Sequence, residues 1–127
     1  MAASLTIGGQ DFGSVGPDFL AERLAGLQSD RRAEVWLTHS TGSSLCLLKS
    51  DDRAMLMLLR SEGDAGMVSR ADDQVDGAAL PFTLSNGQED EHPAGWTIAF
   101  DNARRAMEHF WFGGTPTPFI HWHDDDA

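Results

Sequence analysis

The chain has 127 residues, a common size for one domain, and we predict a single domain over 1–127 in which 1–16 is a weakly patterned lead-in. Twenty acidic residues against nine basic ones give a net charge of −11, which argues against sequence-independent binding to nucleic acid or to an anionic membrane. No apolar run approaches the roughly 18 residues of a membrane span, and the N-terminus lacks the pattern of a signal peptide, so we expect a cytoplasmic protein.

The N-terminal part of the chain predicts one helix after the lead-in. The lead-in is rich in glycine, and within it we expect only a short edge strand, at 5–7. Pro17 suits the first turn of a helix, and Asp18 beside it favours the helix dipole. Leucines recur at positions 20, 24 and 27, along one helical face, and predict that the helix spans 17–28.

Three strand-length apolar segments follow, at 34–39, 44–49 and 54–60. Short polar turns separate them, which favours an antiparallel meander. The second and third segments are apolar at almost every position, which is typical of central strands covered on both faces. The single cysteine, Cys46, lies in the second segment, so we expect it to be buried, without an internal disulfide, in a reducing compartment.

The second helix is the clearest element of the remaining chain. Asp101 is placed to cap it, and an apolar stripe runs along it as far as Phe110. Two glycines at 113 and 114 end it, so we predict a helix over 101–112.

Short strands and turns account for the rest of the second half. Asn86 and Gly87 predict a turn, and the acidic segment at 88–93 is expected as a loop or a sheet edge. Four further short strands are expected, at 66–70, 81–85, 96–99 and 118–123.

The order of these elements predicts an α+β fold, because helices and strands do not alternate as they do in a parallel sheet. We expect a mainly antiparallel sheet of about five to six strands, two helices at about 17–28 and 101–112, and a C-terminal strand.

The sequence His121-Trp122-His123 is the most tempting candidate for a metal site. Alternate residues of a strand share a face, so the two imidazoles could bind zinc or another divalent ion. The set is incomplete, because the sequence holds no second cysteine and no HExxH motif. We therefore expect no metal and no cofactor, with Trp122 packed inward and both histidines facing solvent or a partner.

Two acidic groups could supply paired carboxylates for acid–base catalysis. They are Glu62 with Asp64, and Glu89 with Asp90 and Glu91. Both groups lie in polar loop segments, whereas catalytic carboxylates usually come with a nucleophile, a metal or an apolar pocket that separates their pKa values. A solvated surface is the better interpretation.

Hydrolase chemistry has a similarly weak basis. Ser43 and Ser44 lie close to His39 in the sequence, but no GxSxG turn surrounds either serine. We therefore expect no catalytic residues, and a small metal-dependent or hydrolytic enzyme remains only the alternative hypothesis.

The negative charge is concentrated in one half of the chain. Residues 1–61 hold seven acidic and six basic residues, whereas 62–127 hold thirteen acidic and three basic ones. A basic protein partner is the natural inference, although acidity that only keeps the protein in solution explains the charge about as well. Among the four tryptophans, Trp111 is the preferred interface anchor, because it follows Phe110 off the main apolar stripe. The candidate partner-binding residues are Glu62, Asp64, Glu89, Asp90, Glu91, Trp111, His121, His123, Asp124, Asp125 and Asp126.

Several packing and turn segments together resemble immunity protein family 1 of bacterial polymorphic toxin systems. The resemblance covers roughly residues 33–124, and it depends on the order and spacing of the segments and not on any single chemical motif. The segments are GSSLC at 42–46, AMLMLLR at 54–60, EGDAG at 62–66, LSNGQ at 84–88, RRAMEHF at 104–110 and PFIHW at 118–122.

The resemblance implies a non-enzymatic protein that binds the toxic domain of a neighbouring toxin and protects the producing cell. Several partners of that family are nucleic-acid deaminases, so the resemblance implies a toxin of this kind, neutralised by covering its active or substrate-binding site. An acidic domain is suited to covering a basic substrate surface. An acidic adaptor protein is the alternative within the class of binding proteins.

Overall fold

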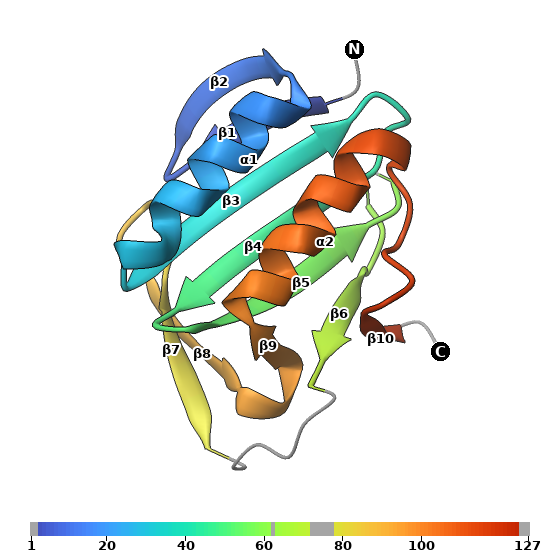
Figure 1. The fold of residues 1–127 in the computed structure, drawn as a ribbon. Helices are drawn as coiled ribbons and strands as arrows, with labels where there is room; N and C mark the ends of the chain where they lie inside the picture. The colour runs from blue at the N-terminus through green and yellow to red at the C-terminus, as the bar shows by residue number, and fades with distance from the viewer. Residues whose placement is uncertain (1–2, 62, 72–77, 125–127) are drawn as a thin grey trace.

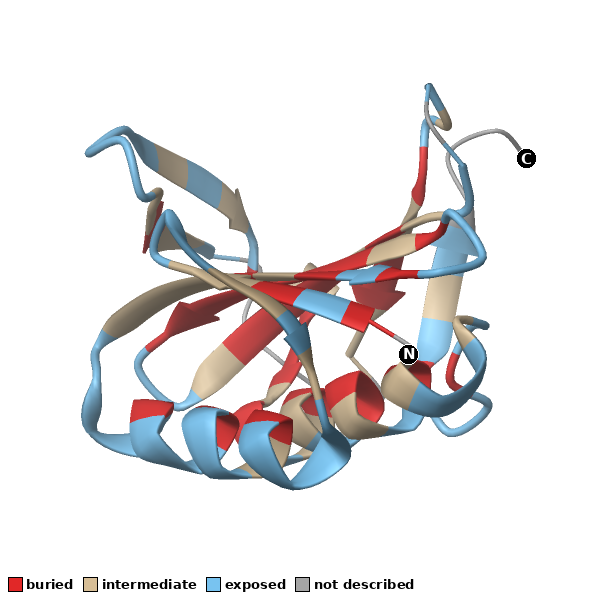
Figure 2. Ribbon diagram, turned by 90° about the horizontal axis from the view of Figure 1, so that it is seen from above, coloured by how far each residue is buried: buried red, intermediate tan, exposed pale blue. Residues whose placement is uncertain are grey.

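One antiparallel sheet forms the middle of the molecule, with both α-helices on one face and a β-hairpin on the other (Figures 1 and 2). The computed structural model describes residues 3–61, 63–71 and 78–124, and it confirms the predicted α+β class. The large sheet has the strand order β10-β6-β5-β4-β3-β1-β2, with β9 pairing with β5, and β7 and β8 form a separate two-stranded sheet.

The described residues contain more strands than the five to six that the sequence predicts. The two strands that lie where no strand was expected are at 10–15, in the lead-in, and at 89–93, in the acidic segment. The elements are β1 Ala3–Ile7, β2 Gln10–Val15, α1 Pro17–Gly26, a 3₁₀ helix Leu27–Ser29, β3 Arg32–His39, β4 Ser44–Ser50, β5 Arg53–Leu59, β6 Met67–Arg70, β7 Ala79–Thr83, β8 Glu89–Pro93, a 3₁₀ helix Ala94–Trp96, β9 Thr97–Ala99, α2 Phe100–Gly113 and β10 His121–Asp124.

The glycine-rich lead-in is a β-hairpin, which the sequence did not predict. Gly8 and Gly9, at φ 58° and 84°, form the turn that joins β1 to β2. The prediction of an edge strand at 5–7 is wrong in position, because β1 pairs with both β2 and β3, and β2 is the edge strand. Glycines lower the strand signal of β2, so its pairing could not be read from composition.

The first helix and the meander agree with the predictions. Helix α1 begins at Pro17, buries Leu20 and Leu24, and passes into the 3₁₀ helix that buries Leu27. Strands β3, β4 and β5 pair antiparallel in sequence, with Trp36 beside Cys46 and Cys46 beside Met57.

Successive side chains of the meander pack on opposite faces of the sheet, as strand geometry requires. On β4, Leu45 and Leu47 join the core under the helices, whereas Cys46 and Leu48 join a smaller cluster under the hairpin. The strand is therefore apolar at nearly every position because both of its faces are covered. Burial raises the pKa of the Cys46 thiol, and the negative charge of Glu34 raises it further, so this cysteine is an inert, buried thiol.

The second helix starts one residue earlier than predicted. Asp101 lies in its first turn and does not cap it, since the capping position is occupied by Ala99. Gly114 ends the helix in the left-handed conformation, at φ 66°, with its N–H donating to the Phe110 carbonyl at 2.8 Å. The predicted apolar stripe is buried. No helix among the described residues is long and apolar enough to cross a membrane.

The C-terminal strand is shorter than predicted. β10 begins at His121 and pairs antiparallel with β6, so the segment before it is not part of the sheet. The Ile120 N–H donates to the Thr117 carbonyl, and this turn leads the chain back from α2 to the sheet edge. Proline at 118 could not have supplied a ladder N–H at that position.

Candidate functional site

The β7–β8 hairpin presents an apolar face to the sheet and an acidic face to solvent. Phe82 pairs with Asp90 and Leu80 with His92, and these side chains lie on the inner face. Glu89 and Glu91 alternate with them and are exposed on the outer face. The acidic segment that was expected as a loop or a sheet edge is therefore a strand whose alternate residues face two environments.

A carboxylate on β3 ties this hairpin to the sheet. Glu34 accepts a hydrogen bond from the Ser85 backbone N–H at 2.8 Å and another from the Trp36 indole N–H at 3.0 Å. Burial alone would raise the pKa of Glu34, but these hydrogen bonds outweigh it and lower the pKa below its usual value. Glu34 therefore stays ionised at neutral pH and holds the hairpin turn in place.

A cavity of about 320 Å³ lies between the hairpin and the sheet, and we call it the hairpin cavity. Its volume is at the small end of the range of about 300–1,000 Å³ that is usual for ligand pockets. Most of its lining is apolar, and its polar lining residues are two carboxylates and one imidazole. The lining residues are Glu34, Trp36, Cys46, Leu48, Met55, Met57, Val68, Leu84, Asp90, His92 and Trp96.

Aromatic rings form one side of the hairpin cavity. The His92 ring lies 5.5 Å from the Phe82 ring and stacks on Trp96, with centroids 5.9 Å apart and an angle of 25° between the planes. The Arg70 guanidinium lies 6.0 Å from the Trp96 ring centroid. Trp96 thus already attracts one cation, as the negative face of an indole ring favours.

Buried hydrogen bonds fix the backbone on which Trp96 sits. The Ser69 hydroxyl donates to the Trp96 carbonyl at 2.7 Å and accepts the Leu56 N–H at 2.9 Å. The Thr97 hydroxyl donates to the Ala94 carbonyl at 2.6 Å. This wall of the cavity is therefore preorganised by β5, β6 and the 3₁₀ helix before β9.

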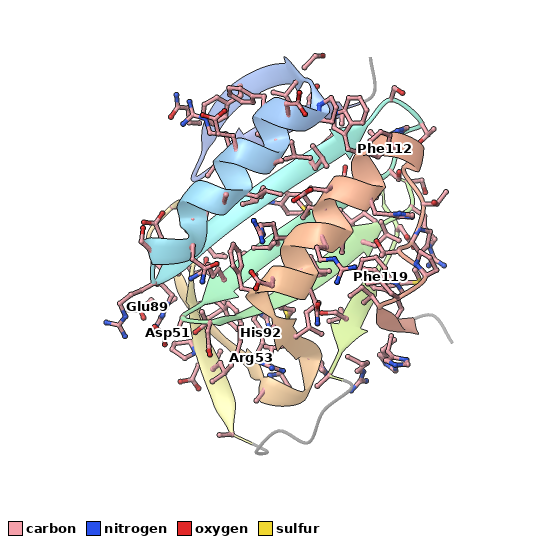
Figure 3. All side chains as sticks on the ribbon, viewed as in Figure 1. Asp51, Arg53, Glu89, His92, Phe112 and Phe119 are labelled. Atoms are coloured by element: carbon pink, nitrogen blue, oxygen red, sulfur yellow. The ribbon has the colours of Figure 1, made fainter. Side chains whose placement is uncertain are left out.

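The structure brings three of the candidate partner-binding residues together on β8. Glu89 and Glu91 are on the outer face of this strand, and Asp90 lines the cavity, where it accepts a hydrogen bond from the Gln88 amide at 2.9 Å. Glu89 and His92 are labelled at this end of the molecule in Figure 3.

The loop before β6 uses its acidic residue internally. Asp64 accepts hydrogen bonds from the Arg60 backbone N–H at 2.8 Å and from the Arg60 guanidinium at 2.8 and 2.9 Å. Hydrogen bonding to Arg60 lowers the pKa of Asp64 strongly. Asp64 therefore closes the loop, and Glu62 lies outside the described residues.

The C-terminal candidates that the structure describes lie on the β10 edge of the sheet, on a different strand and in a different sheet from β8. As expected, His121 and His123 are exposed and Trp122 packs against the core. The Trp122 indole N–H donates to the Thr117 carbonyl at 3.1 Å. The backbone of Asp124 ends β10, and Asp125 and Asp126 lie outside the described residues.

Trp111 has a structural contact that the sequence did not reveal. Its indole N–H donates to the Val15 carbonyl at 2.9 Å, and its ring packs against the core, which ties α2 to the end of β2. The exposed aromatic residues of this region are Phe112 and Phe119, at 69% and 44% exposure (Figure 3).

Two of the three groups considered for hydrolysis, His39 and Ser43, are engaged in partly buried hydrogen bonds, and the third, Ser44, donates its hydroxyl to Thr38 Oγ1 at 3.2 Å. The Thr41 N–H donates to Nδ1 of His39 at 3.2 Å, and the Ser43 hydroxyl donates to the Gly114 carbonyl at 2.7 Å. His39 and Ser43 are both buried, so this serine holds the end of α2 and is not presented to a substrate. Within residues 3–61, 63–71 and 78–124, no three His, Cys, Asp or Glu side chains cluster as a metal site would require.

Neither protein-family models nor curated protein sequences match this chain.

Sequence reasoning found the acidic residues of this site, which it expected in a loop or at a sheet edge, and missed the apolar floor of the cavity. The floor comes from four strands of the sheet, and nothing in a linear sequence tells which face of each strand stays partly open. One signal was available: Leu80, Phe82 and Leu84 recur at every second position, which predicts a strand with one inward face, whereas the segment at 89–93 has no such apolar alternation.

Proposed function

We propose that this protein is an immunity protein, which acts in the cytoplasm by binding and neutralising a cognate bacterial toxin and performs no catalysis itself. The observation that carries the proposal is the hairpin cavity. It is lined mostly by apolar side chains of the sheet, and strand β8, which borders it, exposes Glu89 and Glu91 on its outer face. Such a surface combines an anchor site with a field that attracts a basic protein.

The charge of the chain supports a basic partner. Ten of the eleven net negative charges follow residue 61, and this part of the chain includes the hairpin. Enzymes that act on nucleic acid carry a basic substrate surface, so an acidic protein that covers it also blocks the substrate. Together with the resemblance to immunity protein family 1, this favours a nucleic-acid-targeting, deaminase-type toxin as the partner.

Co-expression tests the proposal directly. The gene beside that of this protein is expected to encode a large protein with a C-terminal toxin domain, and that domain is expressed in a host with and without this chain. We expect the host to survive only when the chain is present, and the two purified proteins to form a stable complex in gel filtration. The host should also survive when this chain is expressed first and the toxin domain is induced later.

Two outcomes would contradict the proposal. A neighbouring gene that encodes a metabolic enzyme, together with no complex between the two products, would favour the alternative of a small enzyme. A complex that leaves the toxin fully active would instead favour an acidic adaptor.

A further inference from the structure

We propose that the hairpin cavity is a receptor for one arginine side chain of the protein partner. The inference rests on the proposed function only for the identity of that partner, because the cavity's preference for a guanidinium can be measured without the toxin. The carboxylates, the aromatic rings and the apolar floor of the cavity together fit a guanidinium on an aliphatic stem.

The charge of the cavity lining favours a cationic ligand. Glu34 and Asp90 both line the cavity, and no lysine or arginine is among the described residues that line it. The two carboxylates already have neutral donors, from Ser85, Trp36 and Gln88, and each ionised oxygen can accept more than one hydrogen bond. A cation that enters the cavity would therefore meet two carboxylates that have neutral donors but no cationic partner among the described lining residues.

A purely apolar side chain does not fit the hairpin cavity best. An apolar side chain that filled the hollow would remove water from both carboxylates without giving them a new partner, and this desolvation is costly. A cationic occupant compensates the same loss with charge-assisted hydrogen bonds. The apolar floor thus has to be matched by a side chain that is apolar along its length and charged at its end.

The aromatic lining of the cavity favours arginine over lysine. The His92 ring stacks on Trp96, which also has the Arg70 guanidinium 6.0 Å from its centroid, and Trp36 lies on the sheet within the same lining. A guanidinium is planar, stacks on aromatic faces, can bind a carboxylate with two hydrogen bonds and is more weakly hydrated than an ammonium. Its aliphatic stem can lie on apolar side chains such as Met55 and Met57.

Four tryptophans provide a built-in reporter of where a ligand binds. Trp36 and Trp96 pack against the cluster under the hairpin, whereas Trp111 and Trp122 pack against the core under the helices. The indole N–H signals of the ¹⁵N-labelled protein therefore divide into a pair at the cavity and a pair away from it. A ligand in the cavity should shift only the first pair.

The probes are short capped peptides of glycine and serine with one central residue, which is arginine, lysine, citrulline or leucine. Citrulline has nearly the shape of arginine but no charge. We expect the arginine peptide to shift the Trp36 and Trp96 signals and to bind about tenfold more tightly than the citrulline peptide. The lysine peptide should fall between the two, and the leucine peptide should bind more weakly than the arginine peptide.

Matched variants on β8 test the geometry. Asp90→Asn removes a charge that lines the cavity and should weaken the arginine peptide several-fold, while Glu89→Gln removes a charge from the outer face of the same strand and should change its affinity by less than a factor of about two. Folding of each variant is checked by its melting temperature.

Three results would overturn the inference. These are no shift of the cavity indoles at millimolar arginine peptide, equal binding of the arginine and citrulline peptides, and tighter binding of the leucine peptide. Protection of the host from the toxin is scored separately with the same variants. Protection of the host without an arginine preference would contradict this inference and leave the proposed function intact. An arginine preference without protection would contradict the proposed function and leave this inference intact.

Discussion

The face of the sheet under the helices and the face under the hairpin differ in how completely their side chains are packed. Under the helices, side chains from β1, β3, β4, β5, α1 and α2 form one continuous core. Under the hairpin, five of the described residues are buried, and partly buried aromatic and apolar side chains line a cavity beside them. A two-stranded hairpin covers less apolar surface than two helices do. The face under the helices therefore stabilises the fold, and the face under the hairpin keeps partly exposed apolar side chains that a partner can contact.

The largest expected effect on stability lies on the helix face. Phe110→Ala should lower the free energy of unfolding by about 3–5 kcal/mol, because Phe110 is 1% exposed and its removal leaves a hole among rigid neighbours. Chemical denaturation gives the value. Phe112→Ala on the same helix is the control, and because Phe112 is 69% exposed its effect should stay within about 0.5 kcal/mol. Equal midpoints for the two variants would mean that the helix face is not the main core.

Phe82→Ala tests the hairpin face in the same way. Phe82 is also 1% exposed, but its neighbours border a cavity and can relax, so we expect a loss at or below about 3 kcal/mol. Amide hydrogen exchange should accelerate in β7 and β8 while protection in α2 is retained. Thr83→Ala, at the neighbouring position of β7, should leave exchange in α2 and the hairpin nearly unchanged. A uniform loss of protection would show that the two faces unfold as one unit.

How far the sequence predicted the molecule differs between the same two faces. The helices and the meander were predictable because their periodicity reports buried stripes, as with Leu20 and Leu24 on α1. The hairpin of β1 and β2 was missed because the glycines in and around its turn weaken the strand pattern of the sequence. The cavity was missed because Trp36 on β3 and Trp96 before β9 reach the same cavity only through the pairing of β3, β4, β5 and β9, and the contact between β5 and β9 is encoded by no local pattern.

A smaller effect is expected where the hairpin is tied to the sheet. Glu34→Gln should lower stability by about 1 kcal/mol at pH 7, an amount limited by the partial exposure of this residue to water. The pKa of Glu34 is lowered in the folded protein, so its stabilising contribution is complete above the ordinary value of 4.5 and is lost as the pH falls through the folded value. The difference between wild type and variant should therefore shrink below pH 4.5.

Denaturation curves between pH 3 and pH 7 measure this difference. Glu22→Gln, an exposed carboxylate on α1, serves as the control. A gap between wild type and Glu34→Gln that stays constant down to pH 3 would show that the charge of Glu34 does not hold the hairpin.

The smallest effect on stability, and a selective one on binding, is expected on the outer face of β8. Changing Glu89 and Glu91 to Gln should leave the melting temperature nearly unchanged and slow association with the proposed toxin by about tenfold at low salt, because exposed charges steer encounter. The dissociation rate should change little. Neutralising Asp124, Asp125 and Asp126 in a second variant compares the tail with the hairpin.

Association rates at low and high salt decide between the two acidic regions. If both variants retain the rate and the salt dependence of the unmodified protein, the acids of the hairpin and the tail only keep the protein in solution, and the interface lies elsewhere.

The alternation along β3 makes the cavity and the core depend on each other. Glu34 and Trp36 point to the hairpin side, whereas Val35 and Leu37 belong to the core under the helices. A slip of β3 by one residue against β4 would exchange the two sets and place a carboxylate and an indole under α1 and α2. A chain that pairs in the wrong register thus loses its binding hollow and its stability in a single step, so misfolded molecules that could still capture the partner are not expected to accumulate.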